Sequence, residues 1–277
     1  MSSNVVRAGR LALIVLAAVA AGGLRAAPNA ELWAVWREAA ADDAGMRLEH
    51  GEWQTLLDRY LLATEDGRTV FAYDAVTPAD RQRLERYLAR LASIDPRKLA
   101  RAEQLPYWIN LYNALTVSVV LDHPDAPSIR RMGGGWFGAG PWDDELLEIA
   151  GHAVTLNDIE HRILRPIWQD HRIHYALNCA SVGCPNLAPR AYTRANAQRL
   201  LEAGEDAYLD HPRGVAFTEE GTLRLSSLFD WYLEDFGGSR AALLDYLAGE
   251  RPGLAQRLTD YQGEIEFHYD WSLNDAE

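Results

Sequence analysis

Apolar residues recur at helical spacing through most of the chain, and they are densest over residues 105–121. Some of them stand at intervals of four and others fill the faces between, so most of the circumference of this segment is apolar. A helix with that pattern is buried on nearly every side. The sequence therefore predicts a central buried helix over residues 105–121, with apolar positions at Trp108, Leu111, Tyr112, Leu115, Val119 and Val120.

Similar spacing, together with start signals such as Thr77-Pro78, predicts further helices on both sides of this segment. Alternating or β-branched runs between them predict short strands, some of which flank tight turns as hairpins. The expected helices cover residues 29–43, 53–61, 77–91, a short stretch from 95, 157–165, 193–208, 226–236 and a stretch after Ser239. The expected strands cover residues 69–73, 146–149, 152–156, 215–217, 223–225, 265–271 and the apolar run directly before Cys179.

This order of elements, helices first and hairpins between the later helices, is typical of an α+β fold. We expect a single domain over residues 28–277 that is mostly helical. Its small antiparallel sheet would be built from hairpins around the central helix at residues 105–121. No internal repeat or low-complexity linker divides the sequence.

The first 27 residues have the order of an export signal. Arg7 and Arg10 precede an unbroken apolar run over residues 11–21, and small residues follow it. Because the run is too short to cross a bilayer, we expect a signal peptide over residues 1–27 and a periplasmic or secreted mature protein. Arg25 and Pro28 are unfavourable beside a cleavage point, so an uncleaved N-terminal anchor remains the alternative. No cysteine follows the run, which argues against a lipoprotein.

Charge excludes one class of partner. The formal net charge is −13, and about −16 without the three arginines of the predicted signal. A surface this acidic repels phosphate backbones, so we expect no nucleic-acid partner. Lys98 is the sole lysine, which almost excludes amine-based catalysis. No second apolar segment is long enough to cross a membrane, so we expect no integral span after signal removal.

Residues 133–141 form a glycine-dense loop with aromatic inserts. The loop lacks the strand-to-helix setting and the Lys-Ser/Thr ending of a phosphate-binding loop, which disfavours a nucleotide site. Long glycine-rich loops are typical of lids, so we expect this one to cover a cleft. No segment matches a cofactor-binding pattern, and we expect no cofactor.

Several phrases of the sequence together resemble one family, the domain of unknown function 547 of bacteria and plants. Their order and spacing match over roughly residues 53–274, and the cysteines show no departure from the family pattern. The resemblance identifies a family and implies no particular reaction. The phrases are YWINLYNAL at 107–115, LNDIEHRILR at 156–165, RIHYALNCASVGCP at 172–185, WYLEDFG at 231–237 and YDWSLN at 269–274.

Cys179 and Cys184 are the two cysteines of the chain and lie five positions apart. An exported chain meets an oxidising compartment, where nearby cysteines form disulfides, provided that the intervening residues form a turn. Gly183 and Pro185 favour such a turn. A structural disulfide is therefore one interpretation, although a bridge that closes so small a loop adds little stability through chain entropy.

The chemical function that we expect first is a thiol-dependent hydrolase or acyl transferase. Cys179 would be the nucleophile, with His161 or His174 as base and Asp270 orienting the imidazole. If the run before Cys179 is an extended strand, His174 lies about 16 Å away, which favours His161. The expected substrate-binding residues are Trp108, Asn110, Asn113, Glu160, Arg165, Ser181 and Cys184.

The two asparagines of this set, Asn110 and Asn113, lie one turn apart on the central helix, where buried amides need hydrogen-bond partners. They would line a pocket, or else they would tie neighbouring loops to the core.

Other functions remain open for the cysteine segment. One is a thiol–disulfide redox protein, although the spacing differs from the C-x-x-C of thioredoxin-like folds. Another is a metal site that combines the cysteines with His161 and His174. A further class is a non-catalytic binding module with a structural disulfide, whose partner would be an unidentified small molecule or peptide.

Overall fold

Helix α3 (Arg101–Leu121) is the element around which the larger hydrophobic core packs. The structure is a computed structural model that describes residues 28–42, 45–134 and 140–276. Nearly every side chain of α3 between Glu103 and Val120 is buried, as its apolar circumference requires. The predicted central helix is confirmed, and it begins a few residues before Leu105.

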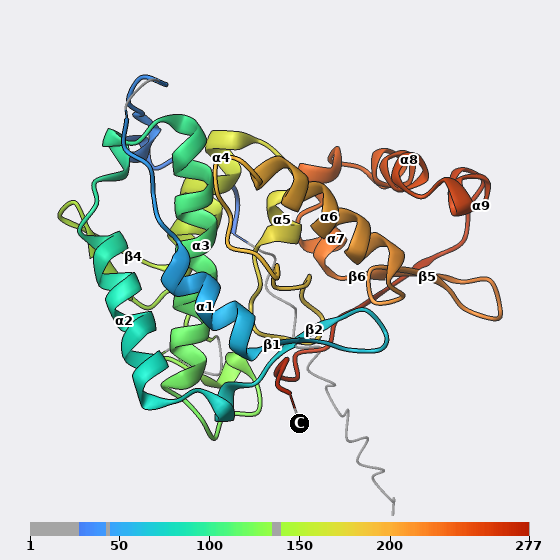
Figure 1. The fold of residues 1–277 in the computed structure, drawn as a ribbon. Coiled ribbons are helices and arrows are strands. Elements are labelled where there is room, and N and C mark those ends of the chain that lie inside the picture. The colour runs from blue at the N-terminus through green and yellow to red at the C-terminus, as the bar shows by residue number, and fades with distance from the viewer. Residues whose placement is uncertain (1–27, 43–44, 135–139, 277) are drawn as a thin grey trace, which may run out of the picture.

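Helices α1 (Gly51–Tyr60) and α2 (Pro78–Ala92) form one side of this core, with α2 against α3 and α1 against α2 (Figure 1). The side chain of Thr77 caps α2 by accepting a hydrogen bond from the backbone N–H of Asp80 at 3.2 Å. This start agrees with the predicted signal, an N-cap followed by proline. Strands β1 (Leu61–Ala63) and β2 (Thr69–Phe71) form an antiparallel hairpin between the two helices.

Most of the remaining elements are short, and most of them lie where the sequence predicts helices and hairpins. The label η marks a 3-10 helix, except for η5, which is a π-helix. In chain order they are η1 (Ala34–Arg37), η2 (Tyr73–Ala75), η3 (Pro96–Lys98), η4 (Ile129–Arg131), β3 (Leu147–Ile149), β4 (His152–Val154), η5 (Asp158–Leu164), α4 (Arg165–Trp168), α5 (Ile173–Ala176), α6 (Ala197–Asp210), β5 (Val215–Phe217), β6 (Leu223–Ser226), α7 (Leu228–Trp231), η6 (Leu233–Phe236), α8 (Arg240–Glu250), η7 (Pro252–Leu254), α9 (Ala255–Thr259) and β7 (Ile265–His268).

The strands of the described residues form small separate sheets. Strands β1 and β2 make one hairpin, and β3 and β4 make another. In the third sheet β6 lies between β5, which is antiparallel to it, and β7, which is parallel to it. The predicted hairpins and the α+β class are confirmed. The parallel pairing of β7 brings the C-terminal segment back to the middle of the fold.

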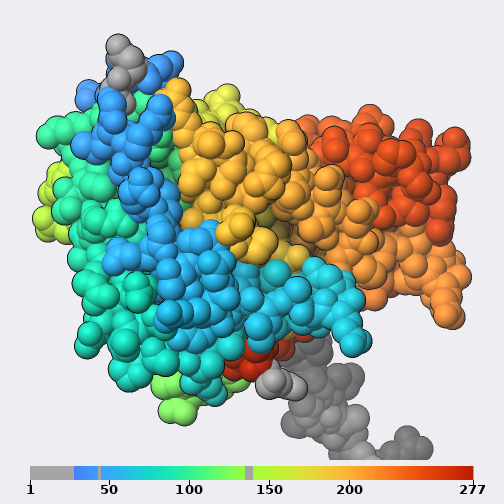
Figure 2. Space-filling view, viewed as in Figure 1, coloured from blue at the N-terminus to red at the C-terminus, as the bar shows by residue number. Residues whose placement is uncertain are grey.

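A second, smaller core lies among α6, α8, α9 and the sheet of β5, β6 and β7. Figure 2 shows this part, orange to red, beside the part built around α3. Helices α5 and α6 approach closely, because a Cβ atom at Gly204 would lie 3.0 Å from the carbonyl oxygen of Tyr175. The absence of a side chain at Gly204 therefore allows α5 to pack this closely against α6.

Two amides of α3 hold the segments on either side of the cysteines. Asn110 donates to the carbonyl oxygen of Tyr192 at 2.7 Å and accepts from the N–H of the same residue at 2.9 Å. Asn113 donates to the carbonyl oxygen of Ala176 and accepts from the N–H of Asn178, both at 2.9 Å. Of the two roles considered for these amides, the structure shows the tying of loops to the core helix.

Two predicted elements are wrong. The described part of the predicted helix, residues 29–42, has a 3-10 turn over Ala34–Arg37 instead. This segment runs along other elements and bonds to them through its backbone, as from the N–H of Glu31 to the carbonyl oxygen of His161. The apolar run before Cys179 is the helix α5 and not a strand. The four residues of α5, apolar except for His174, are too few to show a period that separates a buried helix from a buried strand. The separation of His174 and Cys179 inferred from an extended run therefore does not apply.

The predicted signal peptide lies outside the described residues, as does most of the glycine-dense loop, at 135–139. Within the part of the chain that the structure describes, no helix has both the length and the apolar character that a membrane crossing requires.

Burial of His50 makes stability depend on pH. Burial, with Arg90 adding to it, lowers the pKa of His50 from 6.5 to about 4, and its Nδ1 is 2.7 Å from the hydroxyl of Tyr87. As pH falls from 6.5 towards 4, His50 binds a proton in the unfolded chain but not in the folded chain, so the free energy of unfolding decreases. We expect a loss of about 2 kcal/mol at pH 5 from this residue. The free energy of unfolding, measured by urea denaturation at several pH values, should depend less steeply on pH in His50→Gln than in wild type. The same pH dependence in both proteins would contradict this.

Removal of the Asn113 amide should be costly. Asn113→Ala leaves the buried Ala176 carbonyl and Asn178 N–H without their partners, which we expect to lower the free energy of unfolding by about 2–4 kcal/mol. Asn157→Ala is the matched control, because its amide bonds Asp143 at an exposed position, and we expect a change within about 0.5 kcal/mol. Denaturant titration measures both. Equal effects would show that the Asn113 bonds do not hold the cysteine segment.

Candidate functional site

The two cysteines form a disulfide in the loop between α5 and α6, and their Cα atoms are 6.1 Å apart. Ala180 inside this loop has a positive φ of 57°. A Cβ atom at Gly183 would lie 2.8 Å from the backbone nitrogen of Asp270. Glycine at this position therefore allows the C-terminal segment to lie directly against the disulfide loop.

Hydrogen bonds also hold this loop in place, independently of the disulfide. The N–H groups of Val182 and Gly183 donate to the carbonyl oxygens of Ser272 and Asp270, at 2.9 and 2.8 Å. The buried side chain of Asn178 spans the loop, donating to the carbonyl oxygen of Pro185 at 2.8 Å and accepting from the N–H of Ala180 at 2.9 Å. These bonds do not require the sulfurs to be joined.

Hydrogen-bond donors converge on the sulfur atoms. The N–H of Cys179 lies 2.9 Å from Sγ of Cys184, and the hydroxyl of Tyr269 donates to the same sulfur at 3.2 Å. The hydroxyls of Ser181 and Tyr269 lie 3.2 and 3.3 Å from Sγ of Cys179. Since bonded sulfurs carry no hydrogen, a hydrogen bond between a hydroxyl and either sulfur is donated by the hydroxyl. Each hydroxyl has a single hydrogen, and that of Ser181 is shared with the Tyr269 hydroxyl, which lies 3.2 Å from Oγ of Ser181. Burial raises the pKa of Tyr269, so its hydroxyl keeps its proton.

The sulfurs differ in their exposure. Cys179 is half-buried, whereas Cys184 is only 4% exposed. An attacking group therefore reaches Cys179 first, and the Cys179 N–H and the Tyr269 hydroxyl contact the sulfur that would then leave.

A buried group of acids and imidazoles lies on the elements next to the disulfide loop. The π-helix η5 carries Glu160 and His161, α4 begins with Arg165, α5 carries His174 and η6 carries Asp235. Nε2 of His174 donates to the Asp235 carboxylate at 2.6 Å, and Nε of Arg165 donates to the same oxygen at 2.6 Å. Single π-helical turns are frequent at functional sites.

Charge balance explains how these groups tolerate burial. Burial disfavours the Glu160 carboxylate, but His161, His174 and Arg165 surround it and hold its pKa below the usual value. Burial would likewise raise the pKa of Asp235, but the hydrogen bonds from His174 and Arg165 hold it low. The cluster therefore keeps both carboxylates ionised.

The ring of His161 is fixed as a neutral donor. Burial lowers its pKa to about 4, and Arg165 lowers it further. Nδ1 of His161 lies 3.0 Å from a guanidinium nitrogen of Arg165, which can only donate. The proton of the neutral ring must therefore be on Nε2, which leaves no free nitrogen to act as a base.

The structure brings the predicted site residues together in two groups. Cys179, Cys184 and Ser181 form one group, and Glu160, His161, Arg165 and His174 form the other. Among the described residues the hydrogen-bond partners of the Cys179 sulfur are Ser181 and Tyr269, and neither histidine is one of them. Trp108 lies in the core against Trp36, with ring centres 5.4 Å apart.

Asp270 does not orient an imidazole in this structure. Its carboxylate accepts from the N–H of Ser272 at 2.9 Å, and Asp235 is the carboxylate that bonds His174. Sequence reasoning missed both Asp235 and Tyr269 as site residues. Each lies inside a phrase that carries the family resemblance, at 231–237 and 269–274, which was the signal available.

Burial and the nearby Glu160 carboxylate raise the pKa of Tyr112 of α3. In the part of the chain that the structure describes, no group of three or more His, Cys, Asp or Glu side chains is placed to hold a metal ion.

One comparison with known proteins gives a match. The model of the family described as "Protein of unknown function, DUF547" matches residues 96–209. No curated protein and no solved structure matches the chain. The matched region contains α3, η5 with Glu160 and His161, and both cysteines, and it is narrower than the region of resemblance at 53–274. Residues 96–209 are thus similar to the DUF547 family of proteins of unknown function.

Proposed function

We propose that this protein carries out thiol–disulfide exchange through Cys179 and Cys184, with the disulfide as its oxidised state. The observation that carries the proposal is the convergence of the Cys179 N–H and the hydroxyls of Ser181 and Tyr269 on the two sulfurs. Donors at sulfur stabilise a thiolate and lower the pKa of the thiol. A disulfide with a purely structural role gains nothing from such donors.

The contribution of the bridge to folding supports the same conclusion. A disulfide that closes so short a loop adds about 2 kcal/mol through chain entropy. The loop is already held by Asn178 and by the backbone bonds to Asp270 and Ser272. The reduced protein would therefore keep its fold, which a reversible disulfide needs.

The exchange proceeds in two steps. A substrate thiolate attacks Sγ of Cys179, the bond between the cysteines breaks, and its electron pair moves to Sγ of Cys184. The N–H of Cys179 and the hydroxyl of Tyr269 stabilise the thiolate that leaves. A second thiolate of the substrate then attacks the sulfur of the substrate that is bound to Cys179. The substrate leaves as a disulfide, oxidised by two electrons, and Cys179 and Cys184 take up protons as thiols.

The predicted location of the protein fits this chemistry. We propose export through the signal at residues 1–27, into a compartment where disulfides form and persist. The expected partner is a thiol-containing peptide or small molecule. A nucleic-acid partner is not part of the proposal, because the net charge of −13 opposes it.

A thiol-dependent hydrolase or acyl transferase is the second candidate. The buried cluster of Glu160, His161 and His174 favours acid–base chemistry close to the cysteines. Its nucleophile would be Cys179 in the reduced protein, and an imidazole would have to move to within hydrogen-bond reach of that sulfur. The reduced protein should then hydrolyse p-nitrophenyl acetate, and Cys179→Ser should abolish the turnover. No turnover by the reduced protein would remove this candidate.

The two sulfurs should differ in reactivity. We expect the thiol of Cys179 in Cys184→Ser to react with 5,5′-dithiobis(2-nitrobenzoate) at least about ten times faster than the thiol of Cys184 in Cys179→Ser, because Cys184 is buried. Absorbance at several reagent concentrations gives both rates. Both variants should stay folded, with free energies of unfolding within about 2 kcal/mol of wild type. Equal rates, or loss of the fold in both variants, would instead support a structural disulfide in a binding module.

The hydroxyl of Tyr269 should speed reduction. Tyr269→Phe keeps the ring but removes a donor to the leaving sulfur, so we expect reduction by dithiothreitol to slow by about tenfold. Alkylation and mass spectrometry follow the reduction. Tyr246→Phe is the control, because its hydroxyl donates to Glu205 at 2.6 Å and does not contact the sulfurs. If both variants are reduced at the wild-type rate, the donors have no role in exchange.

A further inference from the structure

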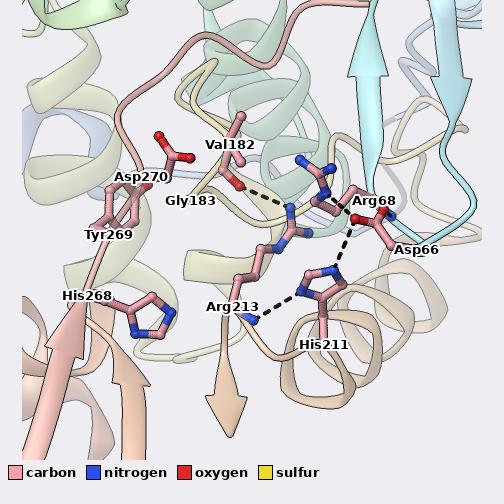
Figure 3. Close-up of a pocket in the computed structure, with 9 residues that line it drawn as sticks. All are labelled: Asp66, Arg68, Val182, Gly183, His211, Arg213, His268, Tyr269 and Asp270. Atoms are coloured by element: carbon pink, nitrogen blue, oxygen red, sulfur yellow. Dashed lines mark hydrogen bonds and ion pairs between the residues drawn. The ribbon is translucent and has the colours of Figure 1, made fainter.

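A cavity of about 230 Å³ lies beside the disulfide loop (Figure 3). Its walls come from four segments that are distant in sequence: the β1–β2 turn, the disulfide loop, the turn between α6 and β5, and the end of β7 with the residues after it. Tyr269 belongs to this wall, and its hydroxyl contacts the sulfurs. The lining residues are Asp66, Arg68, Val182, Gly183, His211, Arg213, His268, Tyr269 and Asp270.

Arg213 gives one wall an unpaired positive charge. Its guanidinium donates to the carbonyl oxygen of Val182 at 3.2 Å and to the amide oxygen of Asn186 at 2.6 Å, both neutral acceptors. No described carboxylate forms an ion pair with it, and its Nε is buried without a hydrogen-bond partner. The guanidinium carries more N–H donors than these bonds use. A partly buried guanidinium without an anion is costly, and a carboxylate ligand would compensate it.

Asp270 gives the opposite wall an unpaired negative charge. Figure 3 shows His268, Tyr269 and Asp270 on one side of the cavity and Arg213 with His211 on the other. One oxygen of the Asp270 carboxylate accepts from the N–H of Ser272 at 2.9 Å. No cation of the described residues pairs with this carboxylate, so it remains available to an ammonium group.

The other charged and titratable groups of the cavity cancel or are neutral. Asp66 and Arg68 form an ion pair at 2.8 Å. Burial lowers the pKa of both His211 and His268, so neither imidazole carries a charge at neutral pH. The uncompensated charges are therefore one cation, Arg213, and one anion, Asp270, on opposite walls.

We propose that this cavity binds a small zwitterion of the size of a free amino acid, with its carboxylate on Arg213 and its ammonium group near Asp270. The volume is too small for a long peptide, and the neighbouring Asp66 and Asp270 oppose a phosphate dianion. Bidentate pairing is the geometry that a guanidinium prefers for a carboxylate. The proposal does not depend on the chemistry of the disulfide.

Calorimetry with the full oxidised chain tests the ligand class. The probes are L-alanine, L-cysteine and L-phenylalanine, with propionate and ethylamine as analogues of alanine that lack one charge each. We expect at least one amino acid to bind with millimolar affinity or better. Where alanine binds, each single-charge analogue should bind at least about tenfold more weakly, since one ion pair is lost. No binding by any amino acid, or equal binding of alanine and propionate, would overturn the proposal.

Variants test the assignment of the two charges. Asp270→Asn keeps an acceptor for the N–H of Ser272 but removes the negative charge, so affinity for the bound amino acid should fall by at least about tenfold. Asp125→Asn is the control, because Asp125 is exposed and does not line the cavity. Arg213→Lys should weaken the binding of the amino acid and of propionate alike, because the lysine ammonium group cannot form a bidentate pair with a carboxylate. Unchanged affinity in Asp270→Asn would contradict the assignment, and this variant should fold whether or not Arg213→Lys does.

Discussion

The requirement that buried polar groups find partners determines the shape of the cysteine segment. Asn113, Asn178 and Asn274 are all nearly fully buried, and each side chain hydrogen-bonds a group of a different segment. Nδ2 of Asn274 reaches the amide oxygen of Asn178 at 3.3 Å, which links the C-terminal segment to the loop. Because an unpaired buried amide costs about 1–3 kcal/mol, the loop, helix α3 and the C-terminal segment are held together as one unit.

This unit explains why the sulfurs, the donors and the cavity lie so close together. The parallel pairing of β7 with β6 delivers Tyr269 and Asp270 to the disulfide loop, where Gly183 allows close backbone contact. The hydroxyl of Tyr269 then faces the sulfurs while its residue also lines the cavity. One short C-terminal segment thus serves both the proposed exchange site and the proposed zwitterion site.

Much of the fold could be predicted from the sequence, because long periodic segments such as α3 and α2 carry their own signal. The four-residue helix α5 could not, since so short an apolar run has no readable period. The cysteines, Ser181, Glu160 and His161 were identifiable because reactive residue types cluster there. Asp235 and Tyr269 were not, because their roles come from tertiary contacts: η6 brings Asp235 to His174, and β7 brings Tyr269 to the disulfide. Arg213 could not be identified either, because its proposed role depends on the cavity that distant segments form around it.

The central claim is that Cys179 and Cys184 switch between disulfide and dithiol inside a protein that stays folded. A titration of the full chain in glutathione buffers of increasing reducing strength tests this most directly, with trapped thiols counted by mass spectrometry and the fold followed by near-ultraviolet circular dichroism. The account predicts one reversible two-electron transition with an unchanged circular dichroism spectrum. Loss of the folded spectrum together with the disulfide, or a disulfide that resists every buffer while the protein is native, would contradict it.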